Sequence, residues 1–222
     1  MKKIALVVAG GSGIRMGHQH PKQFLEIAGK PVLMHTLECF IHFDHAMEIV
    51  VILPEEHIPL WSDLCRKQGF AHTVRMVSGG ETRFQSVKNG LSVIPDEGIV
   101  FIHDGVRPLV SQATLGQCYD MAVLHGNAIP VVPVTESVRW SDRMSSHPLD
   151  RDKLFLIQTP QTFRIPLIKK AYAQDYLPEF TDDASVLEKS GETIRLAQGN
   201  RENIKITWPS DLLIVRALLT GQ

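Results

Sequence analysis

Short apolar runs alternate with longer segments of helical periodicity along most of the chain. The first run, residues 4–9, reads IALVVA without a polar residue. Seven runs rich in apolar and β-branched side chains are predicted to be strands: residues 3–9, 48–53, 73–77, 99–103, 128–134, 193–197 and 203–207. Because such strands lack a regular polar face, we expect them to be buried on both sides of a sheet.

Helical segments separate the predicted strands. Residues 33–42 and 81–94 place apolar side chains three or four positions apart, which predicts two amphipathic helices. Pro209 is expected in the first turn of a last helix, where its missing N–H costs nothing. Residues 181–182 can cap another helix, which Gly191 ends. Together the elements predict an α/β fold: a mostly parallel sheet covered by helices on both faces.

Ligands of parallel sheets bind at the carboxyl ends of the strands. This rule brings four segments together: residues 10–15, 79–86, 104–107 and 205–207. We therefore expect both ends of the chain to contribute to one site.

One polar segment, residues 135–152, interrupts the alternation and shows no clear element. Segments of this length inside a compact domain are often functional or form interfaces. We expect an arm that protrudes from the fold at about residues 135–157, with a flexible surface loop as the alternative. The rest of the pattern runs without a break, so residues 1–222 are interpreted as one domain.

The composition argues against several classes of function. A net charge of −1 without a basic stretch disfavours nucleic acid as a partner. No apolar run approaches the roughly 20 residues that span a membrane, so we expect no membrane association. Cys39, Cys65 and Cys118 lie far apart, and the ten histidines show no metal-ligand spacing. We therefore expect reduced thiols, a cytoplasmic protein and no dedicated transition-metal site.

A glycine-rich turn, GGSG with Gly10, Gly11 and Gly13, follows the first strand. The backbone N–H groups of such a turn form a concave nest that binds phosphate. Arg15 and Lys22 add two cations beside it, although exposed surface positions are the usual place for such residues. A site that stabilises charge on a reacting phosphate needs these cations, so the turn indicates nucleotidyl transfer.

The same turn has an alternative interpretation as the start of a dinucleotide-binding G-x-G-x-x-G motif. Its third glycine position is occupied by Met16. The second strand ends at Leu53, where Glu55 is a poor substitute for the expected ribose-binding acid. A nicotinamide-dependent enzyme is therefore disfavoured.

A second glycine pair, Gly79-Gly80, also lies between a strand and a helix. It would let a planar ring approach the backbone, with Glu81 and Ser86 placed to read the edge of a base. The alternative is an ordinary loop in which Glu81 lies in the first turn of a helix.

Asp104 directly follows a buried strand and could hold Mg²⁺ or a substrate hydroxyl. The alternative is a turn in which Asp104 pairs with Arg107. Lys205 on an apolar strand and Arg151 beside the arm are two further cations, which suggest a second phosphate on a second substrate. Residues 182–183 could form a metal-binding pair, but helix capping is favoured.

Together these motifs resemble the 2-C-methyl-D-erythritol 4-phosphate cytidylyltransferases of the non-mevalonate isoprenoid pathway. The matching segments run almost from end to end: residues 9–16, 21–24, 79–87, 103–108, 158–161, 181–185 and 203–207. The first motif occurs in many sugar nucleotidyltransferases. The ordered set is specific to this family and its relatives, the ribitol-5-phosphate cytidylyltransferases.

The resemblance implies a Rossmann-like nucleotidyltransferase fold and a homodimer with exchanged arms. It implies transfer of CMP from CTP to 2-C-methyl-D-erythritol 4-phosphate, with release of pyrophosphate, in the presence of Mg²⁺ or another divalent cation. Because the attacking oxygen belongs to a phosphate that is already anionic, the reaction needs cations and positioning rather than a general base.

The resemblance also assigns roles to individual residues. It places CTP against Ala9, Gly10, Gly11, Gly13, Gly80, Glu81 and Ser86. It places the acceptor against Asp104, Arg107, Ser137, Arg151, Thr159 and Lys205, with Arg151 and Thr159 entering the neighbouring subunit's site. The implied catalytic cations are Arg15, Lys22, Arg151 and Lys205. Asp104 is the candidate ligand of Mg²⁺, which the CTP phosphates mainly hold.

Three departures from the family pattern leave the acceptor open. Ser137 stands where the family usually has threonine, and Trp140 replaces a cation. Residues 105–106 are Gly-Val instead of Ala-Ala, and a valine before this arginine also occurs in the ribitol-phosphate relatives. A ribitol-5-phosphate cytidylyltransferase is therefore an alternative. A nucleotide-binding sensor without catalytic activity is a more distant one, which the two cations of the glycine turn disfavour.

Overall fold

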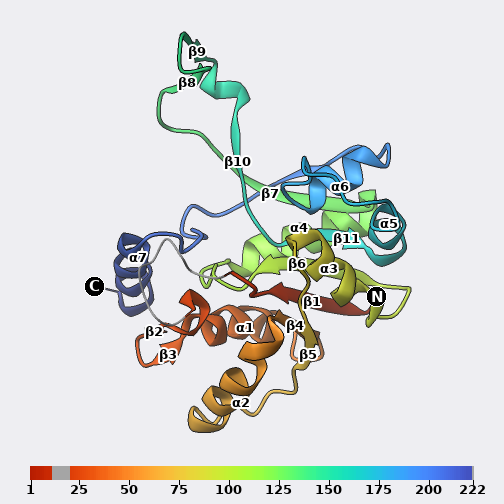
Figure 1. The fold of residues 1–222 in the computed structure, drawn as a ribbon, viewed down its shortest axis with the longest axis vertical. Helices are drawn as coiled ribbons and strands as arrows, with labels where there is room; N and C mark the ends of the chain where they lie inside the picture. The colour runs from red at the N-terminus through yellow and green to blue at the C-terminus, as the bar shows by residue number, and fades with distance from the viewer. Residues whose placement is uncertain (12–20, 222) are drawn as a thin grey trace.

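The computed structural model describes residues 1–11 and 21–221 of the chain. Its centre is an eight-stranded sheet in the order β10-β7-β11-β6-β1-β4-β5, with β12 paired to β7 (Figure 1). The strands are β1 (Lys3–Val8), β4 (Glu48–Leu53), β5 (Arg75–Ser78), β6 (Ile99–Asp104), β7 (Asn127–Pro133), β10 (Phe155–Ile157), β11 (Gln161–Arg164) and β12 (Leu196–Gln198). The neighbours β6, β1, β4 and β5 are parallel, as are β7 and β12, whereas β10 and β11 are antiparallel to their partners. The predicted α/β fold with a mostly parallel sheet is confirmed.

Helices cover both faces of the sheet, because successive side chains of a strand point to opposite sides. On one face, Ala5 and Val7 of β1 pack with α1 (Val32–Phe43), α2 (Ile58–Lys67) and α4 (Gln112–His125). On the other face, Ile4 and Leu6 pack with α3 (Arg83–Ser92), α5 (Ile165–Ala171) and α6 (Asp183–Lys189). A strand enclosed in this way reads as a continuous apolar run, which explains the sequence of β1.

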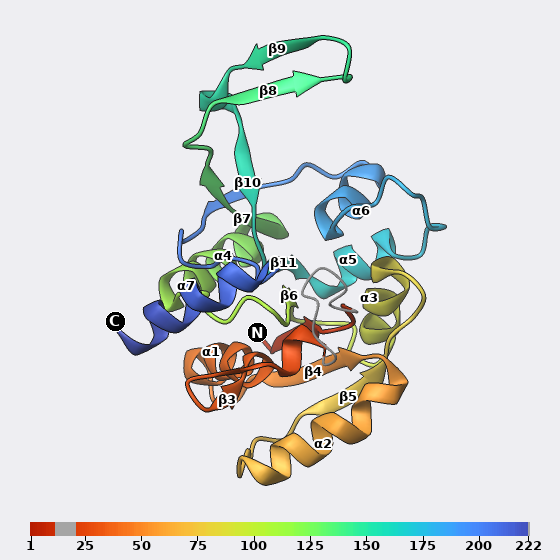
Figure 2. The same ribbon diagram turned by 60° about the vertical axis from the view of Figure 1, so that its left-hand side comes forward.

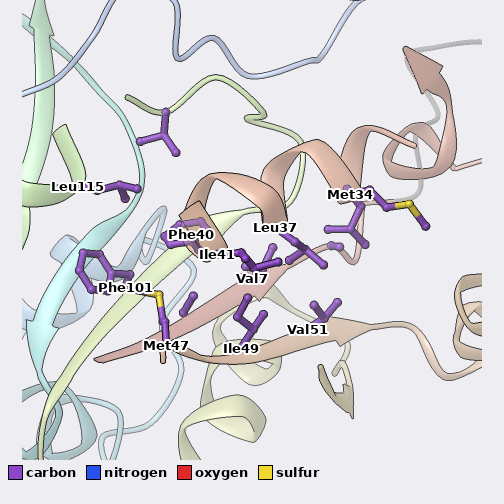
Figure 3. Close-up of a cluster of buried hydrophobic side chains, with 14 of the residues drawn as sticks. Val7, Met34, Leu37, Phe40, Ile41, Met47, Ile49, Val51, Phe101 and Leu115 are labelled. Atoms are coloured by element: carbon purple, nitrogen blue, oxygen red, sulfur yellow. The ribbon is translucent and has the colours of Figure 1, made fainter. Parts of the chain in front are cut away.

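Figure 3 shows the first of these two layers. Leu37 and Phe40 of α1 lie over Val7 of β1 and Phe101 of β6, and all four are fully buried. The rings of Phe40 and Phe101 meet edge to face, 6.1 Å between centroids. Burial of each such side chain contributes about 1.5–3 kcal/mol. The layer therefore holds β1 and β6 in place, and the carboxyl ends of these strands carry the candidate site.

Both predicted amphipathic helices are present, as α1 and α3. The last helix, α7 (Pro209–Thr220), begins at the predicted proline. Asp182 caps α6 by accepting a hydrogen bond from the backbone N of Ser185 at 2.9 Å, and Gly191, with φ 91°, follows the end of this helix. The capping interpretation of Asp182 is confirmed.

The predicted strand at residues 203–207 is wrong. This segment joins no sheet, and its backbone N at Ile206 donates to the carbonyl of Val106 at 3.0 Å. Ile204 and Ile206 instead pack in a small cluster with Val215 of α7 and Val106. The alternation of apolar and polar residues therefore reflects packing under α7 and not pairing with a strand.

The arm protrudes from the sheet as predicted (Figures 1 and 2). It contains a hairpin, β8 (Val138–Ser141) and β9 (Ser146–Leu149), so the interpretation as a segment without elements is wrong. The carboxylate of Asp142 closes the turn by accepting from the backbone N of Met144 and Ser145. Four-residue strands with polar side chains on an exposed hairpin leave no apolar periodicity to detect.

The remaining elements are short. They are the hairpin β2 (Glu26–Ile27) and β3 (Lys30–Pro31) and the single 3₁₀ turns η2 (Lys22–Phe24), η3 (Glu55–His57) and η4 (Arg151–Lys153). Among the described residues, no helix has both the length and the apolar character needed to cross a membrane.

Candidate functional site

An open cleft of about 1110 Å³ lies at the carboxyl ends of β1, β4, β5 and β6. Its walls come from the four predicted segments and from the loop after β4. Its lining includes Gly10 and Gly11, Lys22, Glu55 and Glu56, the segment 78–83, Ser86, Asp104, Val106, Lys205 and Thr207. The rule for parallel sheets thus located the cleft. Gly13 and Arg15 lie outside the described residues.

The glycine segment after β5 forms one wall of the cleft. The backbone N of Gly79 donates to the carbonyl of Leu53 at 2.8 Å, and the backbone N of Gly80 donates to Oγ of Ser86 at 3.0 Å. A Cβ at Gly80 would meet the side chain of Gln85 at 2.2 Å, so the turn requires glycine there. Glu81 is exposed at the rim. This wall presents bare backbone and a carboxylate, which suits a planar, hydrogen-bonding base.

Hydrogen bonds to Ala9 fix the described part of the first glycine turn. The backbone N of Ala9 donates to the carbonyl of Ile52 at 2.9 Å, and the buried amide of Gln23 donates to the carbonyl of Ala9 at 2.7 Å. Next to Gln23, Lys22 donates from Nζ to the carbonyl of Ile206 at 2.8 Å. An ammonium group therefore stands between the first and last segments of the cleft.

Asp104 is the centre of a charged cluster at the opposite wall. Its Oδ2 lies 3.1 Å from Nζ of Lys205 and 3.2 Å from Nε of Arg107. Burial alone would raise the pKa of this carboxyl, but Lys205, Arg83 and Arg107 together hold it well below its usual value. Asp104 is therefore an anion with cations around it. The described residues hold no group of three or more metal-ligating side chains.

A pair of buried hydrogen bonds fixes Thr159 behind Asp104. Its Oγ1 accepts from the backbone N of Asp104 at 3.1 Å and lies 3.0 Å from Nδ1 of His103. The other ring nitrogen, Nε2, lies 3.0 Å from the carbonyl of Arg107, which can only accept, so we assign the ring proton to Nε2. Nδ1 of His103 then carries no proton and accepts the hydrogen bond that the hydroxyl of Thr159 donates. Thr159 is buried and is not among the residues that line the cleft.

The departure at residues 105–106 has a steric reason. A Cβ at Gly105 would lie 2.9 Å from Cβ of Ala9 and 3.1 Å from the Leu33 side chain. Val106 is nearly buried, packs with Ile206 and lines the cleft. Glycine at 105 therefore relieves crowding beneath the first turn, and Val106 adds an apolar surface near Lys205.

His103 should make the protein less stable in mild acid. Burial lowers the pKa of His103 to about 4, so the folded chain does not take up the proton that an unfolded chain binds near pH 6.5. The contribution of neutral, buried His103 to the free energy of unfolding is fully present above pH 6.5. It is lost as the pH falls towards 4, by up to about 3 kcal/mol. Urea unfolding at pH 7 and pH 5 should show that the free energy of unfolding falls more in the wild type than in His103→Gln. Equal losses in the two proteins would contradict this assignment.

The structure places Ser137 and Arg151 away from this cleft. They line a separate hollow of about 460 Å³ at the base of the hairpin, together with Asp150 and Asp152. Arg151 donates from Nη1 to the carbonyl of Thr135 at 2.9 Å. Within one chain, the predicted acceptor residues of the arm therefore do not meet Asp104 and Lys205, and their assignment stays a prediction.

Sequence reasoning gave no role to Arg83, which lines the cleft and forms an ion pair with the buried carboxylate of Asp183. Its place shortly after the second glycine pair, behind Glu81 and Thr82, was visible in the sequence. Its partner was not, because Asp183 lies in a helix-capping motif far along the chain.

Comparisons with known proteins agree over the full length. A model of the family "IspD: 2-C-methyl-D-erythritol 4-phosphate cytidylyltransferase" matches residues 3–221. The chain is 51% identical over 219 residues to the 2-C-methyl-D-erythritol 4-phosphate cytidylyltransferase of Bacteroides fragilis, covering 99% of this chain and 100% of that protein. It is 50% identical over 221 residues to the protein of the same name from Porphyromonas gingivalis, covering 99% of both.

Solved structures show the same likeness. The 4-diphosphocytidyl-2C-methyl-D-erythritol synthase of Anaerococcus prevotii superposes with a TM-score of 0.82 at 28% identity, over 99% of this chain and 98% of that one. The 2-C-methyl-D-erythritol 4-phosphate cytidylyltransferase of Thermus thermophilus gives 0.78 at 27% identity, over 99% and 100%. Sequence, fold and cleft agree, and the chain belongs to the 2-C-methyl-D-erythritol 4-phosphate cytidylyltransferase family, a family of nucleotidyltransferase enzymes.

Proposed function

We propose that this chain transfers CMP from CTP to 2-C-methyl-D-erythritol 4-phosphate and releases pyrophosphate. The observation that carries the proposal is the convergence, in one cleft, of a bare glycine wall, the ammonium of Lys22 and the Asp104–Lys205 pair. The identity of the two substrates is inferred from the family to which the chain belongs. The glycine wall with Glu81 and Ser86 binds the cytosine, and Asp104 with Lys205 binds the hydroxyls and phosphate of the acceptor.

The reaction is an in-line displacement at the α-phosphorus of CTP. An oxygen of the acceptor phosphate forms the new O–P bond while the bond to the β-phosphate oxygen breaks, and pyrophosphate leaves with the electron pair. The attacking oxygen carries no proton at neutral pH, so no base has to remove one. The difficulty is bringing two anions together. Lys22 and Lys205, which both line the cleft, offset that repulsion and stabilise the charge that gathers on the phosphorus oxygens.

We propose that Mg²⁺ enters with the triphosphate. The part of the chain that the structure describes holds no group of three or more metal-ligating side chains, which suits an ion that keeps most of its ligands from phosphate and water. When bound, such an ion would offset negative charge on the triphosphate and so make pyrophosphate a better leaving group.

A homodimer with exchanged arms accounts for the position of Ser137 and Arg151. Beside the arm, β10 exposes Phe155, Leu156 and Ile157, with Leu156 at 58% of its surface. Three consecutive apolar residues exposed on a strand are typical of a protein interface. We propose that a second copy covers them and that each arm delivers Arg151 to the other subunit's cleft. We also place the enzyme in the cytoplasm, where its three unpaired thiols stay reduced.

The deciding experiment is pyrophosphate release from Mg-CTP with two acceptors in parallel, 2-C-methyl-D-erythritol 4-phosphate and ribitol 5-phosphate. We expect a strong preference for the first. A preference for the second would keep the cleft and its chemistry but assign the enzyme to ribitol-phosphate activation, with Val106 and the arm as the misjudged features. Binding of CTP without turnover on either acceptor would contradict catalysis.

A further inference from the structure

Arg83 lines the cleft, yet it belongs to none of the groups assigned above to either substrate. It is the first residue of α3 and directly follows the loop 79–82. Its Nη1 donates to Oδ1 of Asp183 at 2.8 Å and its Nη2 donates to Oδ2 at 2.7 Å. Asp183 is completely buried at the start of α6. A two-pronged contact of this kind fixes orientation as well as distance, so α3 and α6 are locked where both helices begin.

A second contact secures the same junction. The hydroxyl of Tyr172 donates to Oδ1 of Asp183 at 2.6 Å. The ring of Tyr172 stacks on Phe84, the residue after Arg83, with 4.7 Å between centroids. Polar and aromatic contacts therefore meet on the first turn of α3, which carries the glycine loop at its amino end.

The contacts continue from α6 to the acceptor end of the cleft. Gln161 on β11 donates to Oδ2 of Asp182 at 2.8 Å and accepts from the backbone N of Ala184 at 2.7 Å. Thr159, just before this strand, accepts from the backbone N of Asp104. The nucleotide wall and the acceptor wall are thus joined through α6 as well as through the sheet.

The charges of Arg83 and Asp183 also influence the acceptor wall, through Asp104. Burial opposes the charge on Arg83, but Asp183 and, more weakly, Asp104 raise the pKa of Arg83 above its ordinary value. In turn, Arg83 helps to keep Asp104 ionised. Because Asp183 already occupies the fork of the guanidinium, Arg83 is poorly suited to hold a phosphate and well suited to hold the loop.

We propose that Arg83 and Asp183 form a positioning pair, which holds the glycine loop 79–82 in the geometry that binds CTP. The inference rests on the proposed function. It assigns Arg83 no contact with the reacting atoms, and its effect acts through the loop.

Two variants test the pair. Arg83→Lys keeps the charge but replaces the fork with a single point contact. The double variant Arg83→Gln/Asp183→Asn removes both charges, so no unpaired charge is left in the interior. In each we expect the dissociation constant of CTP, measured by calorimetry without acceptor, and the KM for CTP to rise about tenfold or more, while kcat changes by less than about threefold. A folded Arg83→Lys protein that binds CTP as tightly as the wild type would overturn the proposal.

The matched control is the ion pair of Lys3 and Asp44, 2.6 Å apart near the other end of β1. Lys3→Met/Asp44→Asn should lower Tm without changing the affinity for CTP. If this control weakens CTP binding as much as the Arg83 variants do, the effect is general loss of stability and the positioning role is wrong.

A measurement on the wild type covers the case in which the variants do not fold. We expect CTP to slow amide hydrogen exchange in residues 79–86 and also in residues 182–187 across the ion pair. Slower exchange in the first segment alone would overturn the proposal. Turnover of the wild type tests the proposed function separately. A wild type that binds CTP but releases no pyrophosphate would contradict the proposed function. The hydrogen-exchange and calorimetric results would still decide the positioning role of Arg83.

Discussion

Lys22→Ala should lower kcat at least about a hundredfold while the chain keeps its fold. Lys22 lies at the edge of the cleft, where its Nζ donates to the carbonyl of Ile206 at 2.8 Å. Negative charge gathers on the oxygens of the α-phosphorus as pyrophosphate leaves, so an ammonium group there stabilises the transition state more than bound CTP. Loss of one preorganised donor of this type costs about 10²–10³ in rate. The measurement is pyrophosphate release at saturating CTP and acceptor.

The hydrogen bond to Ile206 makes a stability control necessary, since its loss costs about 1 kcal/mol. Circular dichroism and Tm should therefore show a native fold at the assay temperature. Lys30→Ala is the matched lysine variant, because Lys30 pairs with Glu38 on the surface and is not among the residues that line the cleft. It should turn over like the wild type. Near-normal kcat in a folded Lys22→Ala protein would rule out the role assigned to this lysine.

Much of the cleft could be predicted because its position follows from local pattern. The apolar run of β1 is buried between two helical layers, so its composition identifies it as a central strand. A glycine turn at the end of that strand then falls on the ligand edge of the sheet. The same reasoning located residues 79–86 and Asp104, which lie at the ends of β5 and β6.

Other features depend on contacts between distant parts of the chain. The ion pair of Arg83 and Asp183 joins residues that are far apart in sequence, and Asp183 lies in a motif that reads as a helix cap. The segment 203–207 alternates like a strand but packs under α7, because tertiary contacts decide where such a segment goes. Position on the arm also gives no indication of which subunit's cleft Arg151 serves.

Mixing two inactive variants should restore activity if the arms are exchanged. In the proposed dimer, each cleft takes Lys22 from one chain and Arg151 from the other. Lys22→Ala and Arg151→Ala homodimers then each have two defective clefts. A mixed dimer has one cleft with both defects and one intact cleft, formed by the core of the Arg151→Ala chain and the arm of the Lys22→Ala chain. Because one of its two clefts is intact, a purified mixed dimer should show about half of wild-type kcat.

Co-expression with two different tags gives the mixed dimers, and kcat is measured after purification on both tags. The matched control pairs Lys22→Ala with Lys205→Ala. Both lysines line the same cleft of one chain, so every cleft in that mixed dimer carries one defect and activity stays at the level of the parents. Recovery in the first mixture only would establish that Arg151 acts on the other subunit. If neither mixture recovers although the tagged dimers form, each arm serves its own chain, and the hollow that Arg151 shares with Ser137 must move towards the cleft when substrates bind.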